Sequence, residues 1–267
     1  MNRSETQFDP RRYWEERGRR FARTGSGWKA VCLKGAPEFY NRLLHRLQRK
    51  ALLPEFGSAG GAALEFGCGV GRWLEELTGR FEKIRGLDIS LPMLERARER
   101  LSGAGSGDIR LCRFDGSRIP FSSGVFDLVF SVTVLIHIVD DEVLTRAVGE
   151  MARVAAPEGK IVILETFSSG SDSSLPHLRF RPEGAVAGLF RQSGWRLVSS
   201  RPVYFLFPPE RALSTRPERI LIRLALPGYY LLNRLDQVLK FSRRPVQKIQ
   251  VYRRGPGGDV TAPEERG

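Results

Sequence analysis

The chain has 267 residues, of which 41% are hydrophobic and 27% are charged, and its formal net charge is +13. A chain of this length and composition can bury a sizeable core as one large domain with additions. It has no run of 18 or more uncharged apolar residues, which excludes a transmembrane helix, and its first residues lack the apolar centre of a signal peptide. We therefore expect a cytoplasmic protein.

The positive charge is concentrated in two segments. Residues 1–50 carry 13 basic and 5 acidic residues, and residues 201–254 carry 12 basic and 3 acidic residues. Residues 51–200 are close to neutral, with 17 basic and 19 acidic residues. Two basic segments beside a neutral centre suit a phosphate-bearing substrate, nucleic acid or an anionic membrane face. The alternative is a solvated arginine-rich surface without a ligand.

The cysteines indicate neither a disulfide framework nor a metal site. Cys32, Cys68 and Cys112 are scattered along the chain, with no CxxC pair. Three isolated cysteines are too few for a zinc site, and isolated intracellular thiols usually stay reduced. We expect structural thiols and no bound metal.

The middle of the chain alternates short apolar runs with amphipathic stretches, a pattern typical of a parallel sheet covered by helices. Strands are predicted at residues 62–66, 83–89, 109–114, 125–132 and 160–166. Helices are predicted at residues 72–80, 91–101 and 141–155. Ser90 is expected to cap the second helix, and the segment Pro157–Gly159 is expected to end the third and turn the chain into the next strand.

A glycine-rich turn follows the first predicted strand. Gly67, Gly69 and Gly71 stand at alternate positions, and glycine permits positive φ and close approach of a ligand to the backbone. The spacing is G-x-G-x-G, whereas dinucleotide-binding turns have G-x-G-x-x-G, so we expect a ligand with an amino-acid end in place of a pyrophosphate. The alternative, a plain strand-to-helix turn, would need only one glycine.

Acidic residues stand at the ends of the next two predicted strands. Asp88 ends the second strand, where a carboxylate can accept both hydrogen bonds of a ribose diol. The alternative is that Asp88 caps the following helix, although Ser90 is better placed to do so. At the end of the third strand, Asp115, followed by Gly116 and Ser117, is placed to accept a hydrogen bond from an adenine amino group.

Taken together, these motifs resemble those of class I S-adenosylmethionine-dependent methyltransferases. The resemblance rests on "LEFGCGVGRW", "GLDIS", "FDGSRIPF", "FDLVFSVTVLIHI" and "ARVAAPEGKIVILE", in the order and spacing of the family, with Glu158 where the family usually has glycine. It implies an α/β fold with a Rossmann-like, seven-stranded, mostly parallel sheet, an antiparallel last strand and helices on both faces. It also implies S-adenosyl-L-methionine as methyl donor and S-adenosyl-L-homocysteine as product.

This fold gives the remaining segments expected places. A strand is predicted at residues 195–205 and a returning seventh strand at residues 247–255, and residues 9–21 are expected to close over the site as a lid. The expected parts are an N-terminal helical lid at 1–55, the methyltransferase core at 56–207, a basic amphipathic helical insertion at 208–245, the final core strand at 246–255 and a disordered tail at 256–267.

The resemblance also implies which residues bind the cofactor. The expected set is Glu65, Gly67, Cys68, Gly69, Gly71, Arg72, Asp88, Ile89, Met93, Asp115, Gly116, Ser117, Ser131 and Val132. Arg42 or Arg46 is expected to pair with the cofactor carboxylate, as an arginine just ahead of the first motif does in related quinone O-methyltransferases. The spacing of these arginines to the glycines differs from that in the relatives.

Two histidines are candidates for a general base, which methyl transfer needs only when the acceptor is a hydroxyl. His137 follows the fourth strand, whose carboxyl end opens on the ligand crevice. Its alternative role is packing or capping. His177 follows the fifth strand in a Ser/Gly-rich stretch, where Arg179 and Arg181 are placed to bind a substrate anion. The alternative there is a solvated loop.

We therefore predict a methyltransferase whose acceptor is a small molecule, a glycan or a lipid-linked compound, methylated at oxygen. The basic insertion favours peripheral association with the inner membrane face. RNA is an alternative acceptor because the chain is basic, although no recognisable RNA-binding module is present. An alternative from another class is a non-catalytic binding protein that keeps the fold.

Overall fold

The computed structural model describes residues 8–25, 27–32, 38–57, 60–103, 107–114, 118–168, 175–204 and 246–255. The helices are α1 (Pro10–Phe21), α2 (Trp28–Val31), α3 (Glu38–Phe56), α4 (Leu74–Leu77), α5 (Leu91–Leu101), η1 (Leu135–His137), α6 (Asp141–Val154) and α7 (Glu183–Gln192). The strands are β1 (Ala62–Phe66), β2 (Lys83–Asp88), β3 (Asp108–Arg113), β4 (Phe126–Val132), β5 (Ala155–Phe167), β6 (Trp195–Tyr204) and β7 (Val246–Arg254). The predicted insertion, the predicted tail, Asp115, Gly116 and Ser117 lie outside the described residues.

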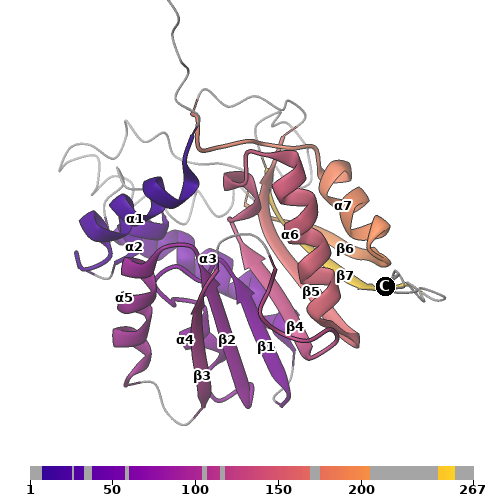
Figure 1. Ribbon diagram of the computed structural model, residues 1–267, viewed down its shortest axis with the longest axis horizontal. Coiled ribbons are helices and arrows are strands. Elements are labelled where there is room, and N and C mark those ends of the chain that lie inside the picture. Colours follow the sequence, from indigo (N-terminus) through magenta and orange to yellow (C-terminus); the bar gives the residue numbers. More distant parts are fainter. Residues whose placement is uncertain are drawn as a thin grey trace, which may run out of the picture.

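The seven strands form one sheet in the order β3-β2-β1-β4-β5-β7-β6 (Figure 1). Within the first five strands, all neighbouring strands are parallel, and β7 runs antiparallel to both β5 and β6. The predicted fold with its antiparallel last strand is therefore confirmed. Strand order reverses between β1 and β4, and α/β sheets bind their ligands beside the carboxyl ends of the strands at such a point.

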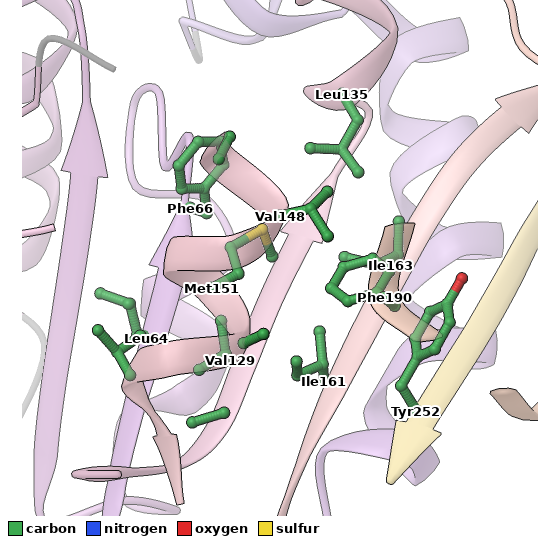
Figure 2. Packing of buried hydrophobic residues seen from close by; sticks show 14 of the residues in the cluster. Leu64, Phe66, Val129, Leu135, Val148, Met151, Ile161, Ile163, Phe190 and Tyr252 are labelled. Atoms are coloured by element: carbon green, nitrogen blue, oxygen red, sulfur yellow. The ribbon is translucent and has the colours of Figure 1, made fainter. Parts of the chain in front are cut away.

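Helices cover both faces of the sheet, with α6 and α7 on one face and α3 on the other (Figure 1). Figure 2 shows the α6 and α7 side, where Met151 and Phe190 lie over the side chains of Val129, Ile161 and Ile163. These side chains are all buried, and each contributes about 1.5–3 kcal/mol relative to exposure. No helix in the described ranges is long and apolar enough to cross a membrane.

The apolar runs form strands because the central strands are buried on both faces. Six of the seven residues of β4 are buried, as expected for a strand inside a parallel sheet. The outer strand β3 has no fully buried residue, and its pattern alternates between exposed and half-buried positions. The amphipathic stretches supply the helices above them, so the sequence pattern and the layers agree.

Two elements differ from prediction. The helix expected at residues 72–80 is only one turn long, from Leu74 to Leu77. β5 begins at Ala155 instead of residue 160, because the segment Pro157–Gly159 forms an irregularity within the strand. A Cβ atom on Gly159 would lie 2.9–3.0 Å from three backbone carbonyl oxygens, so this irregularity requires glycine.

Candidate active site

A cavity of about 810 Å³ opens at the carboxyl ends of β1, β2 and β4. Its walls come from the glycine turn after β1, the segment after β4, the first turn of α6 and the start of α1. Ligand sites usually measure about 300–1,000 Å³, so this cavity is large enough for a cofactor-sized molecule. Its position at the reversal of strand order is where a ligand is expected in this fold.

The three glycines of the turn adopt positive φ, with values of 78° at Gly67, 52° at Gly69 and 74° at Gly71. A Cβ on Gly67 would lie 2.4 Å from Val134, and a Cβ on Gly69 would lie 2.5 Å from Val31. The glycines therefore bring the turn against the segment after β4 and against α2. They serve packing within the protein as well as access for a ligand.

Asp88 fixes the glycine turn and also faces the cavity. Its carboxylate accepts hydrogen bonds from the backbone N–H of Gly69, at 2.7 Å, and of Ser90, at 2.9 Å. Burial raises the pKa of Asp88 to about 6, and these hydrogen bonds act in the opposite direction. Ser90 occupies the N-cap position of α5, but its hydroxyl donates to the carbonyl of Trp14, 3.2 Å away, instead of capping the helix.

Several buried polar side chains from β1, from α3 and from the end of the glycine turn lie beside the cavity. The side chain of Glu65 is 1% exposed, its Oε2 has no hydrogen-bond partner among the described residues, and burial raises its pKa well above the usual value. Arg72 donates to Gln48 at 3.2 Å, and one of its nitrogens lies 3.3 Å from Nδ1 of His45. Burial and the charge of Arg72 lower the pKa of His45 to about 3, so the ring is neutral and accepts.

Most of the predicted cofactor residues that the structure describes line this cavity. They are Glu65, Gly67, Cys68, Gly69, Arg72, Asp88, Ile89, Met93 and Val132. Four predicted residues are not part of the lining. Gly71 packs against Ala97, Ser131 is buried in β4, and Arg42 and Arg46 are exposed on α3.

His137 lines the same cavity. Its Nδ1 lies 2.9 Å from the backbone carbonyl oxygen of His177. A carbonyl only accepts, so Nδ1 carries the hydrogen and Nε2 keeps a free lone pair. Burial lowers the pKa of His137 to about 4, which keeps the ring neutral at pH 7. The edge-to-face contact with Trp14, at 4.7 Å between ring centres, also restrains the ring.

His177 is not part of the lining; its ring stacks on Tyr13 at 4.6 Å. The neighbouring arginines bind protein groups. Arg179 contacts one carboxylate oxygen of Asp141 at 2.7 Å, and Arg181 contacts the other at 2.9 Å. Arg181 also donates to the carbonyl of Ile138 at 2.7 Å. These contacts hold the segment after β4. Arg179 also lines the cavity, and binding of a substrate anion by Arg179 or Arg181 stays a prediction.

The sequence predicted that residues 9–21 close over the site, but it did not identify which side chains form the outer wall of the cavity. Phe8, Asp9, Pro10, Arg11, Trp14 and Val31 from the N-terminal part line it, together with Thr133, Val134 and Ile138–Val143. One feature of the sequence does indicate that α1 packs closely on another element, namely Gly18 within an otherwise charged helix. Glycine is unfavourable there, and its buried position against Ser90 and Met93 lets α1 approach α5 closely.

The sheet with one antiparallel strand, the alternate-glycine turn and the acid at the end of β2 define the class I S-adenosylmethionine-dependent methyltransferase fold. Residues 63–159 match the family described as methyltransferase domain. The match includes the glycine turn, Asp88 and the segment that carries His137.

Curated relatives are similar over the same region. The chain is 33% identical to methyltransferase GfsG of Streptomyces halstedii over 118 residues, which are 43% of this chain and 41% of GfsG. It is 35% identical to the demethylmenaquinone methyltransferase of Shouchella clausii (strain KSM-K16) over 126 residues, 46% of this chain and 52% of that protein. The chain thus spans about half the length of the curated relatives it matches.

Solved structures share the fold over more of the chain. The [4+2]-cyclase SpnF has a TM-score of 0.57 and 19% identity, with 80% of both chains covered. Phosphoethanolamine N-methyltransferase 2 of Haemonchus contortus, in complex with S-adenosyl-L-methionine, has a TM-score of 0.57 and 18% identity, with 78% of this chain and 52% of that chain covered. DhpI, in complex with SAH, has a TM-score of 0.54 and 17% identity, with 92% and 96% covered.

Proposed function

We propose that the protein transfers the methyl group of S-adenosyl-L-methionine to an oxygen of a small-molecule, glycan or lipid-linked acceptor. The observation that carries the proposal is one cavity whose lining includes the glycine turn, Asp88 and His137. The match to the methyltransferase domain family supports the reaction type. Fold alone does not, because the neighbour SpnF is a [4+2]-cyclase.

The chemistry of the lining fits the cofactor. S-adenosyl-L-methionine supplies a methyl group activated on a sulfonium, and its other polar groups are an ammonium, a carboxylate and ribose hydroxyls. Asp88 would accept from the ribose hydroxyls, and the free Oε2 of Glu65 would accept from the ammonium. Arg72 is a better candidate for the carboxylate than Arg46, because Arg72 lines the cavity and Arg46 is exposed.

His137 is the proposed general base. Its neutral ring keeps Nε2 available for the proton of an acceptor hydroxyl, and the carbonyl of His177 fixes the tautomer. A positioned base of this kind contributes about 10²–10⁴-fold to a rate. In this assignment His177 acts through its backbone carbonyl and not as a second base.

The N-terminal helices are proposed to form a lid over the acceptor side. Arg17 of α1 donates to the carbonyls of Ala30 at 2.6 Å and Lys29 at 3.1 Å, so α1 and α2 are joined. Trp14 from α1 and Val31 from α2 both line the cavity. Such a lid would exclude water from the reacting groups and would open for exchange of reactants.

Peripheral membrane association is a further part of the proposal, motivated by the basic segment 201–254. Sedimentation with vesicles that contain anionic lipid tests it directly. We expect binding at low salt and release at high salt, because screening weakens the attraction between lipid and protein. No sedimentation at low salt would contradict this part without affecting the reaction type.

The reaction itself is tested with S-adenosyl-L-methionine that carries a labelled methyl group. The purified protein is incubated with a panel of sugar, lipid and RNA acceptors, and labelled products are identified by mass spectrometry. We expect label on a hydroxyl oxygen of a small or lipid-linked acceptor. Salt-sensitive labelling of RNA would favour the RNA alternative, and absence of cofactor binding in calorimetry would favour a non-catalytic protein.

A further inference from the structure

A buried carboxyl group lies near the carboxyl end of β5, outside the cavity lining. Glu165 of β5 is 1% exposed, and its Oε1 accepts from the backbone N–H groups of Val134, at 2.6 Å, and Leu135, at 2.7 Å. Its Oε2 has no hydrogen-bond partner among the described residues. A carboxyl group is costly to bury, so its retention in a central strand calls for an explanation.

Arg181 binds the backbone carbonyl groups of the segment that follows β4, whose N–H groups Glu165 binds. Arg181 donates to the carbonyl of Leu135 at 3.4 Å and to the carbonyl of Ile138 at 2.7 Å. Leu135 is therefore bound through its N–H by Glu165 and through its C=O by Arg181. These two residues also line one small cavity of about 10 Å³. The first N–H groups and the last carbonyl groups of a helix have no partner within the helix. Glu165 accepts from the former and Arg181 donates to the latter at the one-turn helix η1.

The segment begins with a strained residue. Thr133 has a φ of 54°, which β-branched residues rarely adopt, and it lines the main cavity. Such a conformation persists only where the surroundings fix it. Here the backbone N–H of Thr133 donates to the carbonyl of Leu164 at 2.7 Å, and the next two N–H groups are bound by Glu165.

The side chains of the segment pack on both sides. Leu135 is buried beside Val148 of α6 (Figure 2). Val134 fills the space above Gly67, where a Cβ would be 2.4 Å away. The conformation fixed at residues 133–135 therefore determines both the contact with the glycine turn and the place where His137 leaves η1.

We propose that Glu165 is a positioning residue that sets the conformation of residues 133–138 and so holds His137 at the cavity, with Arg181 as its counterpart. The inference rests on the proposed role of His137 as base. Glu165 touches neither reactant in this assignment. It acts through the backbone of Val134 and Leu135, two and three residues before the base.

The test follows the titration of His137 by imidazole NMR. The chain has three histidines, so the signal can be assigned by comparison with His137→Gln. In the wild type we expect a neutral Nδ1–H ring that titrates near pH 4. In Glu165→Leu the segment is released, and the pKa of His137 should rise by at least one unit toward the unperturbed value of about 6.5.

Two substitutions separate positioning from a general loss of stability. Glu165→Gln keeps an acceptor oxygen, and burial raises the pKa of Glu165 to about 8, so an uncharged amide resembles the group at neutral pH. We expect this variant to retain the wild-type titration of His137. Glu183→Leu is the matched control, because Glu183 binds Lys248 and Ser200 and is not part of the cavity lining.

An unchanged pKa of His137 in folded Glu165→Leu would overturn the proposal. If that variant does not fold, Glu165→Asp takes its place, since one fewer methylene withdraws the oxygen from both N–H groups. An unchanged titration there would be equally decisive against it. The titration needs neither cofactor nor acceptor, so failure of methyl transfer in the wild type would contradict the proposed function and leave this measurement interpretable.

Discussion

At the scale of single residues, Asp88 connects the fold to the site. Its carboxylate binds the N–H groups of Gly69 and Ser90, and the same side chain lines the cavity. A change at this position should therefore affect the shape of the turn as well as the proposed contact to ribose. An experiment on Asp88 therefore needs a control substitution at a carboxylate that stabilises the sheet away from the cavity.

Asp88→Ala should weaken binding of S-adenosyl-L-methionine at least tenfold, which corresponds to ~1.4 kcal/mol, because it removes a buried acceptor. Isothermal calorimetry measures the change. Asp127→Ala is the control, since Asp127 accepts from the backbone N–H of Ala62 at the opposite end of β1, 2.8 Å away. Equal affinities in wild type and Asp88→Ala would show that the ribose binds elsewhere.

The affinity for S-adenosyl-L-methionine should also depend on pH through Asp88. The ionised carboxylate is the form that accepts from two hydroxyls, and the pKa of Asp88 is raised to about 6. Affinity should therefore fall as the pH drops through 6. For folding the sign is opposite, because a raised acid pKa favours the folded state below that pH. Calorimetry between pH 5 and about 8 should find a flat profile in Asp88→Asn.

At the scale of elements, the docking of α1 on α5 shapes the outer wall. Gly18 allows it, since a Cβ there would lie 2.9 Å from Oγ of Ser90 and 3.2 Å from Cγ of Met93. The hydrogen bond from Ser90 to the carbonyl of Trp14 crosses the same contact. The helix that carries Trp14 to the cavity is thus positioned by its least bulky residue.

Gly18→Leu should push α1 away from α5, weaken cofactor binding several-fold and make residues 22–32 more sensitive to protease, because the contact has no room for a larger side chain. Limited proteolysis and calorimetry check both effects. Gly149→Ala in α6 is the matched control. A Cβ at Gly149 meets no atom within 4 Å, so this change should stabilise the helix by about 0.5–1 kcal/mol. Wild-type binding in Gly18→Leu would mean that α1 does not form this wall.

At the scale of the whole molecule, stability in acid should depend on His45. Its pKa is lowered to about 3 by burial and by Arg72, so the unfolded state binds a proton below pH 6.5 while the folded state does not. Wild type should therefore lose stability relative to His45→Gln as pH falls from 6.5 toward 4, by up to about 1.4 kcal/mol per pH unit. Urea unfolding at several pH values measures this difference, and parallel curves would contradict it.

Much of the sheet could be predicted from sequence because central strands are nearly continuous apolar runs, as in β4. That Gly67 and Asp88 line one cavity could also be predicted, since both stand at the carboxyl ends of neighbouring parallel strands, which meet at one edge of the sheet. The approach of residues 9–21 to the site could be predicted too, but the contacts that fix α1 in place could not. Trp14 reaches the cavity because α1 and α5 approach each other closely at Gly18. The hydrophobic periodicity of a helix does not predict how closely it packs against another helix.

The arginines illustrate the same limit. The position of Arg46 ahead of the glycine turn favours a role in the site, but Arg46 is exposed on α3, whereas Arg72, directly after the turn, is buried at the cavity. Which of two arginines faces inward depends on how α3 is rotated against the sheet. The position of an arginine in the sequence does not predict that rotation.

The packing of α2 on the glycine turn has a kinetic consequence. Val31 occupies the space above Gly69, and Arg17 joins α2 to α1, so a cofactor bound at the proposed site would be covered by two helices that move together. Exchange of S-adenosyl-L-homocysteine for a fresh donor would then set the pace of turnover instead of the transfer step. The steady-state rate should fall as solvent viscosity rises, while the first turnover of a preloaded enzyme stays insensitive to it.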